Sequence, residues 1–480
     1  MRLNGARCEA TWLASLPGLA TVATALLCAC SEATKPNVPA AVLLVSGSAQ
    51  TGEVGRPLAE PLVVKVVDSI GRPIPGISVT WTSTQGGGHL AASAADTSSA
   101  SATPIHTTTD DVGIASSLLI LGQAGGAYGV MASVPGAGSV SFTVSAIIIA
   151  NTISVGWGYT CALTARGDAY CWGSTNNGTV GVEPALVSGV KLASVTAGQM
   201  GACGLASDGT AYCWGYNPQG QLGNGTTAPS ATPTPVSGGL RFTSLATGDF
   251  NTCGISTGGA AYCWGENDGG QLGDSTTDSS LVPVAVKGGH SFSSLSVAYR
   301  NACGVTTGGE VWCWGGSGPS IPALVPGGLS FRSVTVGIVA TCGLVVGGAA
   351  YCWGYNGFGQ LGVGPGTASS SSPLPVAGAL TYGTVATFWY HTCAVATGGH
   401  AYCWGRDERG ELGNGTTGDT LYTPTPVSGT LTFASIATGT DNTCALATSG
   451  TAYCWGWNNQ GQLGDGTTSD RSAPTRVRFF

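Results

Sequence analysis

The most regular hydrophobic pattern in the chain is a pair of short apolar runs around a Gly-rich centre, which recurs through the last two thirds of the sequence. One copy, beginning at Thr252, reads "TCGISTGGAAYCWG". Two such runs predict a β-hairpin that turns at Thr257–Gly259. Residues equidistant from the middle of that turn face each other, which places Cys253 directly opposite Cys263.

The same hairpin pattern occurs seven times, at intervals of about 40 to 50 residues, the length of a four-stranded repeat. Every copy carries two cysteines ten positions apart. Facing cysteines in a non-hydrogen-bonded pair can form a disulfide, so we predict seven hairpin bridges, each stabilising by about 2 to 3 kcal/mol. Zinc ligation, the alternative, would need two further ligands at each site, and the chain has five His. The pairs are Cys161 and Cys171, Cys203 and Cys213, Cys253 and Cys263, Cys303 and Cys313, Cys342 and Cys352, Cys393 and Cys403, and Cys444 and Cys454.

Aromatic residues flank the second cysteine, as Tyr and Trp do in "AYCWG". Side chains alternate along a strand, so the Cys points to one face of its sheet and the Trp to the other. Both faces of each unit are then uncharged and need covering, which seven sheets arranged radially achieve. We interpret the Trp side chains as packing between blades rather than as sugar-binding residues. They are Trp172, Trp214, Trp264, Trp314, Trp353, Trp404 and Trp455.

The full repeat, in its last copy "LTFASIATGTDNTCALATSGTAYCWGWNNQGQLGDGTTSDRSAPTRV", resembles the repeat of the regulator of chromosome condensation family. The matching residues are "CAL", the Gly that follows, the Tyr-x-Trp-Gly run, and "NxxGQLGxGTT", almost intact at Asn217–Thr227 and Asn458–Thr468. The resemblance covers residues 151–480 and implies a seven-bladed β-propeller in an all-β protein. Two copies, "CWGSTNNGTVGVEP" and "CWGGSGPSIP", lack part or nearly all of the loop, so we expect those blades to be shorter at that corner. The sequence does not predict how the ring closes.

Residues 39–146 contain no Cys and read as about seven short strands separated by Gly, Pro and Asp turns, which is typical of a β-sandwich. The strand segments are "AVLLVSG", "PLVVKVVDS", "ISVTWTST", "PIHTTT", "GIASSLLILG", "AYGVMASV" and "VSFTVSA". The stretch "VVDSIGRPIPGISVTW", followed later by "TTDDVGIASSLLI", resembles the bacterial immunoglobulin-like domains of surface adhesins. This resemblance implies an immunoglobulin-like β-sandwich that acts as a spacer.

Residues 1–30 have the features of a secretory signal, since Arg2 and Arg7 precede an apolar span that is too short to cross a membrane stably. The segment ends in "LCAC", which resembles the bacterial lipobox and implies acylation of Cys30, followed by a polar tether at residues 31–38. Cleavage as an ordinary signal peptide is the alternative. We expect export, with a lipid anchor in the bacterial cell envelope at its outer membrane, or secretion; disulfides persist in such compartments. No membrane contact other than the lipid anchor is expected.

Charge and composition exclude some function classes. Only 9% of residues are charged and the net charge is -7, so the chain lacks the basic patch that nucleic-acid binding needs. No constellation of nucleophile, base and orienting group stands out, and we expect no catalytic residue, cofactor or metal in what we take to be a monomer. A hydrolase with carboxylates at the mouth of the propeller channel is kept as an alternative, because several Asp fall in turns: Asp249, Asp268, Asp274, Asp441 and Asp465.

Variation among the copies is concentrated in loops at one end of the ring. If the strands of each unit are A to D, the A–B turns and C–D loops share one end and the B–C hairpins the other. The A–B turns and the residue after each "CWG" carry aromatic and Arg side chains, which are typical of protein-binding hot spots. The alternative is that several turn inward and plug the channel. The candidate binding residues are Trp157, Tyr159, Met200, Tyr216, Phe250, Glu266, Tyr299, Arg300, Tyr355, Trp389, Tyr390, His391, Arg406, Asp441 and Trp457.

The resulting hypothesis is a non-enzymatic envelope protein whose propeller binds a macromolecular partner, in the first place a protein, through its loop-rich end. The resemblance agrees with this, since members of the family include a nucleotide-exchange factor for a small GTPase and an exported bacterial inhibitor of β-lactamase, which act by protein contact. A glycan-binding surface protein is the other alternative, with Trp389 and Trp457 as stacking platforms.

Overall fold

The structure of the chain, a computed structural model, describes residues 38–93, 104–175, 178–199 and 201–480. Every regular element in these ranges is a β-strand, and no helix there is long and apolar enough to cross a membrane. Two compact units are present: one comprises the described residues up to 50 with 57–120 and 128–144, and the other comprises 51–56, 121–127 and 145–480. The predicted signal sequence, Cys30 and Met200 lie outside the described residues.

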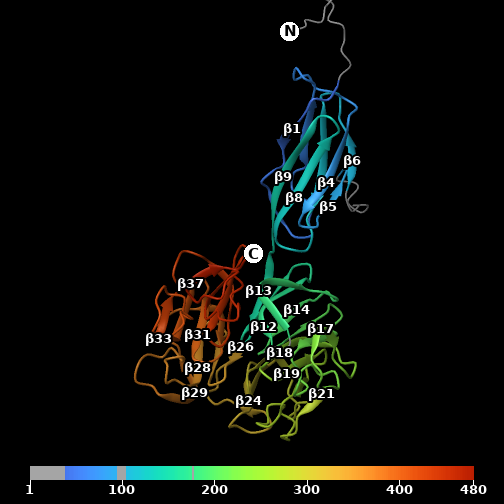
Figure 1. The fold of residues 1–480 in the computed structure, drawn as a ribbon. Coiled ribbons are helices and arrows are strands. Elements are labelled where there is room, and N and C mark those ends of the chain that lie inside the picture. Colours follow the sequence, from blue (N-terminus) through green and yellow to red (C-terminus); the bar gives the residue numbers. More distant parts are fainter. Residues whose placement is uncertain (1–37, 94–103, 176–177, 200) are drawn as a thin grey trace, which may run out of the picture. The chain divides into compact units, whose positions relative to one another are not determined.

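The N-terminal strands, blue to cyan in Figure 1, form two sheets with the orders β1-β3-β7-β5 and β2-β9-β8-β4-β6. Alternation along β3 and β7 buries Val64 and Leu119, and the ring centroids of Trp81 and Phe142 lie 5.9 Å apart in the core. Each predicted strand segment contains one strand; β2 and β5, of three residues each, are too short to give an alternating pattern. The bounds are β1 Ala41–Ser46, β2 Thr51–Glu53, β3 Leu62–Val67, β4 Ser78–Gln85, β5 His89–Ala91, β6 Ile105–Thr108, β7 Ile114–Ile120, β8 Gly126–Val134 and β9 Gly138–Ile147.

From Ala150 to Arg476 the described chain forms seven four-stranded sheets, each made of four consecutive strands. We number them in chain order from sheet 1 (β10–β13) to sheet 7 (β34–β37). The first strand of each sheet contacts the first strand of the next, and β34 contacts β10, so the sheets close into a ring. The strands are β10 Ala150–Val155, β11 Tyr159–Thr164, β12 Ala169–Thr175, β13 Gly178–Val187, β14 Ser194–Ala197, β15 Gly201–Leu205, β16 Ala211–Gly215, β17 Ser230–Pro235, β18 Phe242–Thr247, β19 Asn251–Ser256, β20 Ala261–Gly265, β21 Ser280–Ala285, β22 Phe292–Val297, β23 Asn301–Thr306, β24 Val311–Gly315, β25 Ala323–Leu324, β26 Phe331–Val336, β27 Ala340–Val345, β28 Ala350–Tyr355, β29 Ser369–Pro375, β30 Tyr382–Thr387, β31 His391–Ala396, β32 Ala401–Asp407, β33 Asp419–Pro426, β34 Phe433–Thr438, β35 Asn442–Ala447, β36 Ala452–Gly456 and β37 Arg471–Arg476.

The second and third strands of every sheet form the predicted hairpin, and the two cysteines are direct partners across it. A disulfide joins each pair, with Cα atoms 4.0 or 4.1 Å apart. The disulfides of sheets 1 to 6 pack against the following sheet. Cys203 and Cys213 of sheet 2, for example, share a buried cluster with Phe242 and Trp264 of sheet 3. The Cys and Trp of one strand therefore cover opposite faces, as the alternation predicts.

In five of the seven sheets, a hydrogen bond from the indole of the Trp after the second cysteine ties the sheet to a loop of the one before it. The indole N–H of Trp264 donates to the carbonyl oxygen of Gln221 in sheet 2 at 2.9 Å, and the Thr252 hydroxyl donates to the same oxygen at 3.1 Å. Gly223, in the same "GQLG" loop, has a φ of +65°, and a Cβ there would lie 2.7 Å from the indole nitrogen. We call this contact of Trp, loop carbonyl and glycine the Trp clamp. The same indole bond runs from Trp172, Trp314, Trp404 and Trp455 to Gln462, Gln271, Gln360 and Glu411.

Sheets 1 and 4 lack the "GQLG" loop, and the structure shows two different consequences. In sheet 1 the prediction of a shorter blade is wrong, because β12 and β13 continue as a hairpin up to the pair Thr175 and Gly178. Trp214 of sheet 2 then donates its indole N–H to the hydroxyl of Tyr159, at 3.2 Å, in place of a loop carbonyl. In sheet 4 the fourth strand is reduced to Ala323–Leu324, as the short loop predicts.

The ring closes by packing of its two ends, because sheets 1 and 7 each consist of four consecutive strands and exchange none. Trp172 and the Thr160 hydroxyl both donate to the carbonyl oxygen of Gln462, at 2.9 and 3.0 Å. Phe480 is fully buried, with its ring centroid 5.7 Å from that of Trp172. In sheets 3 to 7 an aromatic residue of the first strand occupies this place, so Phe480 supplies the ring that β10 lacks.

Removing one bridge tests how much the disulfides stabilise the sheets. We expect Cys253→Ala combined with Cys263→Ala to lower the free energy of unfolding by about 2 to 3 kcal/mol, because the bridge restricts a short loop of the unfolded chain. Denaturant unfolding under non-reducing conditions, followed by tryptophan fluorescence, measures the change. An unchanged transition would mean that the hairpin hydrogen bonds alone suffice.

Loss of the Phe480 ring should open the contact between sheets 7 and 1. We expect Phe480→Ala to cost about 3 kcal/mol, because it leaves Trp172 facing a cavity. Thermal unfolding checks this against Val346→Ala, whose side chain is 72% exposed and should not matter. Equal stability of the two variants would contradict closure through Phe480.

Candidate functional site

The A–B turns and the C–D loops meet at one end of the ring, which we call the loop face. Backbone hydrogen bonds join the two series there, because the residue after "CWG" donates its N–H to the carbonyl of the residue that precedes the second strand. The Arg406 N–H donates to the Tyr390 carbonyl at 2.9 Å. The residue after each of these "CWG" runs is therefore a direct neighbour of a residue in the A–B turn of the same sheet, and does not merely lie at the same end of the ring. The other pairs are Glu266 with Phe250, Tyr355 with Val339, and Trp457 with Asp441.

A continuous group of aromatic side chains lies on the loop face between sheets 5 and 6. The ring centroid of Phe358 lies 6.5 Å from that of Tyr355 and 4.6 Å from that of Tyr390. Trp389 stacks on Tyr390 with a centroid separation of 5.1 Å. Tyr355 is 45% exposed and the other three are partly exposed. We call Tyr355, Phe358, Trp389 and Tyr390 the aromatic ladder.

Arg406 is bound to one end of the aromatic ladder. Its guanidinium carbon lies 4.8 Å from the centre of the Tyr390 ring, which is the geometry of a cation–π contact. The same guanidinium forms ion pairs with Asp441, with Glu411 at 3.4 Å and with the exposed Glu408 at 3.7 Å. Arg406 is therefore held between an aromatic face and three carboxylates, and it fixes the position of the ladder.

A smaller group of the same kind lies between sheets 3 and 4. The rings of Phe250 and Tyr299 are 6.3 Å apart and nearly perpendicular, and the Arg300 guanidinium lies 4.9 Å from the Tyr299 ring centre. Arg300 also pairs with the exposed carboxylate of Asp268. The remaining candidates, Trp157, Tyr216, Glu266 and Trp457, are partly exposed in other turns of the loop face.

Two predicted binding residues are not available to a partner. Tyr159 is 3% exposed, because its hydroxyl serves as the acceptor for Trp214. His391 is 1% exposed, and its Nε2 lies 3.0 Å from the Thr443 hydroxyl. Burial, and next the nearby Arg406, lowers the pKa of His391 to about 3, so the ring is neutral at physiological pH. For these two the interpretation as exposed contacts is wrong. They are buried against the next sheet, and neither is among the described lining residues of the central channel that the alternative would have them plug.

Sequence reasoning missed three residues of this region. Phe358 stands in a loop where the equivalent residues are Gln219, Gly269, Arg409 and Gln460, so comparison of the copies could have revealed it. Asp407 replaces the repeat's Asn, and Glu411 replaces the Gln of "GQLG". The same comparison shows these departures as well, but their burial could not be read from the sequence.

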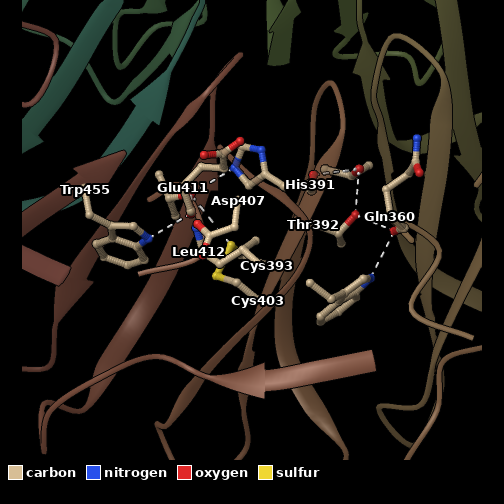
Figure 2. The surroundings of a disulfide bond; sticks show 12 residues. Gln360, His391, Thr392, Cys393, Cys403, Asp407, Glu411, Leu412 and Trp455 are labelled. Atoms are coloured by element: carbon tan, nitrogen blue, oxygen red, sulfur yellow. Dashed lines mark hydrogen bonds between the residues drawn. A yellow bond between two sulfur atoms is a disulfide. The ribbon is translucent and has the colours of Figure 1, made fainter. Parts of the chain in front are cut away.

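Figure 2 shows the buried carboxylates of sheet 6 beside the disulfide of Cys393 and Cys403. Asp407 Oδ1 accepts the Leu412 N–H at 3.1 Å, the bond that the repeat's Asn makes elsewhere. The carbonyl oxygen of Glu411 accepts the Trp455 indole N–H at 3.0 Å. Glu411 thus belongs both to a Trp clamp and, through its carboxylate, to the Arg406 contact on the loop face.

Burial changes the ionisation of these acids. It raises the pKa of Glu411 to about 7 and that of Asp407 to about 6, and it raises the pKa of Asp441 as well. Arg406 favours ionised Glu411 and Asp441, but loss of water outweighs that attraction. In sheet 3, burial and then Glu266 raise the pKa of Asp249 to about 7.

Two cavities of the ring bear on the hydrolase alternative, because each lies near residues that the sequence analysis named for it or at the channel itself. The central channel encloses about 250 Å³ and is lined by hydroxyl and aliphatic side chains of the first strands and by Phe388, without a carboxylate or imidazole among its described lining residues. A second cavity, beside Gln199 and Asp249, holds about 20 Å³, which is room for little more than one water. No group of three or more His, Cys, Asp or Glu in the described ranges is arranged to hold a metal ion.

Comparison with known proteins gives matches over the ring. The family model described as RCC1-like domain matches residues 182–480, and that of the regulator of chromosome condensation (RCC1) repeat matches residues 151–179. The chain is 38% identical over 96 residues to the ultraviolet-B receptor UVR8 of Arabidopsis thaliana, which is 20% of this chain and 22% of the receptor. The match thus spans about a fifth of that relative's length.

The fold of the ring is also similar to solved structures. One is yeast RCC1 (Prp20) bound to Kap60, with a TM-score of 0.59 and 21% identity over 66% of this chain and 84% of that one. Another is Prp20p from Saccharomyces cerevisiae, described with its binding properties to Gsp1p and histones, with a TM-score of 0.58 and 21% identity over 66% of this chain and 87% of that one. At this identity the likeness shows the fold alone.

The buried carboxyl group of Glu411 makes the free energy of unfolding depend on pH. Because the pKa of Glu411 is about 7 in the folded protein and 4.5 ordinarily, the folded state holds the proton more tightly. The free energy of unfolding should fall as pH rises from about 4.5 to 7, by up to about 1 kcal/mol per pH unit for this group. We expect Glu411→Gln, which restores the repeat's residue, to remove from that slope the contribution of one titrating proton.

Denaturant unfolding at several pH values between 4.5 and 8 measures the effect. Glu408→Gln is the matched control, since it removes a carboxylate that pairs with the same Arg406, at 3.7 Å, but whose side chain is 62% exposed. Identical pH profiles for the Glu411→Gln variant and the unchanged chain would contradict the raised pKa.

Proposed function

The chain belongs to the RCC1-like domain family, and from that premise we propose that it binds a protein partner through the aromatic ladder of its loop face. One observation carries the proposal: the four rings of the aromatic ladder form an uninterrupted, partly exposed group, and Arg406 contacts the ring of Tyr390 at one end of it. Aromatic and Arg side chains contribute most of the binding free energy in protein interfaces.

The scaffold under the ladder is suited to binding because it is pre-organised. The turn of Trp389 and Tyr390 follows β30 directly, and the Tyr390 carbonyl accepts the N–H of Arg406 from β32. Arg406 is in turn paired with Asp441 of the next sheet. Side chains that are already ordered lose little conformational entropy on binding, which favours affinity.

Two similar structures support a role in protein binding. In one of them yeast RCC1 (Prp20) is bound to Kap60, and the other was described together with the binding of Prp20p to Gsp1p and histones. We propose the same general activity for this chain, with a different partner. Catalysis is not part of the proposal, since the described lining of the channel consists of hydroxyl and aliphatic side chains and Phe388.

We further propose that the protein is exported and lipid-anchored to the bacterial cell envelope through Cys30. The "LCAC" signal supports this, and so do seven disulfides, which persist outside the cytoplasm. In this proposal the seven sheets are the blades of a seven-bladed propeller, and residues 39–146 form an immunoglobulin-like spacer.

A photo-cross-linking amino acid at Tyr355, the most exposed position of the ladder, tests the proposal. The protein, expressed in its own envelope, should cross-link to a defined protein that mass spectrometry identifies. Trp389→Ala with Tyr390→Ala should reduce that product at least tenfold, because each hot-spot truncation costs about 2 kcal/mol of binding.

Two controls use Val346, which lies on a B–C hairpin. A cross-linker at that position should not give the product, and Val346→Ala should leave the product formed from position 355 unchanged. Thermal unfolding should be the same for all variants. Cross-linking that survives the double substitution would contradict the ladder as the binding site.

A further inference from the structure

Three aliphatic side chains are exposed together at one end of the N-terminal unit. Ile70 is 68% exposed, Val38 is 62% exposed and Val112 is 57% exposed, so they are three of the four most exposed large hydrophobic side chains in the described chain. Single exposed aliphatic residues are common on soluble proteins. Three on adjacent segments of one small unit form a surface, which we call the aliphatic surface.

Backbone pairing places the three segments side by side. The Ala40 N–H donates to the Val67 carbonyl at 2.9 Å, and the Val66 N–H donates to the Gly113 carbonyl at 2.9 Å. These bonds align the start of β1, the end of β3 and the start of β7, which are neighbours in one sheet. Val38, Ile70 and Val112 lie one to three residues beyond those bonded residues, and hence at the same end.

Ile70 and Val112 occupy equivalent positions in two turns of the same design. Asp68 Oδ1 accepts the N–H of Ile70 at 3.0 Å, and Asp110 Oδ1 accepts the N–H of Val112 at 3.0 Å. The glycine after each aliphatic residue has a positive φ, +83° at Gly71 and +76° after Val112. The Asp side chain satisfies the turn internally, so the residue that follows it at the apex is free to be apolar.

We propose that the aliphatic surface enters the interface of a lipid bilayer. This rests on the proposed anchor: seven residues separate Cys30 from Val38, and an extended chain of that length spans at most about 30 Å. An acyl group on Cys30 would therefore hold this end of the unit closest to the membrane. The proposal extends the sequence-based expectation that only the lipid anchor touches the membrane.

Charge selects the kind of membrane. Asp110 and Asp111 are exposed beside Val112, and Arg72, two residues after Ile70, is paired with Asp68 at 2.7 Å. A surface of this kind gains from burying apolar area and is repelled by anionic headgroups. The aliphatic surface should therefore prefer neutral phospholipid, with little dependence on salt.

The membrane contact can be measured without relying on native acylation. Residues 31–480 carrying a hexahistidine tag at the N-terminus are bound to phosphatidylcholine vesicles that contain a nickel-chelating lipid. A nitrobenzoxadiazole label on Ile70→Cys or Val112→Cys reports apolar surroundings, and Val346→Cys is the control. The label is selective because the fourteen native cysteines of the ring are paired.

We expect emission at positions 70 and 112 to rise at least about twofold on vesicles and to be quenched by brominated lipid, with no change at position 346. Ile70→Asp should lower the signal of the label at position 112, whereas Val346→Asp should not. A signal that is absent, equal at position 346, or dependent on anionic lipid overturns the proposal. High emission without vesicles in a dimeric sample also overturns it, because a second copy then covers the surface. Mass spectrometry of the native N-terminus tests acylation of Cys30 separately.

Discussion

The Trp clamp is the contact on which the ring depends. One indole N–H crosses from each clamped sheet to a backbone carbonyl of the sheet before it, at about 3 Å, in a fully buried place where an unpaired donor would be costly. The glycine beside that carbonyl leaves room for the ring, and the disulfide of the preceding sheet packs against it. A single Trp thus contacts both the disulfide and the loop of the sheet before it.

The clamp also explains how the ring tolerates departures from its repeat. Where sheet 1 lacks the loop, the Tyr159 hydroxyl replaces the carbonyl for Trp214. Where β10 lacks an aromatic residue, Phe480 packs against Trp172 instead. Because the sheets are held from within, the A–B turns and the residues after "CWG" are free to differ. Those loops carry the aromatic ladder.

Sheet 6 departs from the repeat at residues that lie next to Arg406 and the aromatic ladder. Asp407 and Glu411 accept the same backbone N–H groups as the Asn and Gln they replace, yet they place carboxyl groups in a buried site where ionisation is costly. Glu411 and Asp441 hold Arg406 against Tyr390. Burying these carboxyl groups destabilises sheet 6 locally, while Glu411 helps to fix Arg406 at the surface. Local destabilisation of this kind is expected where a surface side chain is held in place for binding.

Much of the fold could be predicted from the sequence, because the hairpin pairing of Cys253 with Cys263 and the alternation of Cys and Trp are local properties of strands. The N-terminal strand segments were predicted for the same reason. The burial of Tyr159 and His391 could not be, since it depends on Trp214 and Thr443 of neighbouring sheets. Phe358 was missed because a single copy does not show that Phe358 contacts Tyr355 of its own sheet and Tyr390 of the next sheet.

The most direct test of this account is peptide mapping by mass spectrometry of the unreduced protein. The account predicts seven disulfide-linked peptides, each joining two cysteines ten residues apart within one sheet. Free thiols, bound metal, or bridges between different sheets would contradict it.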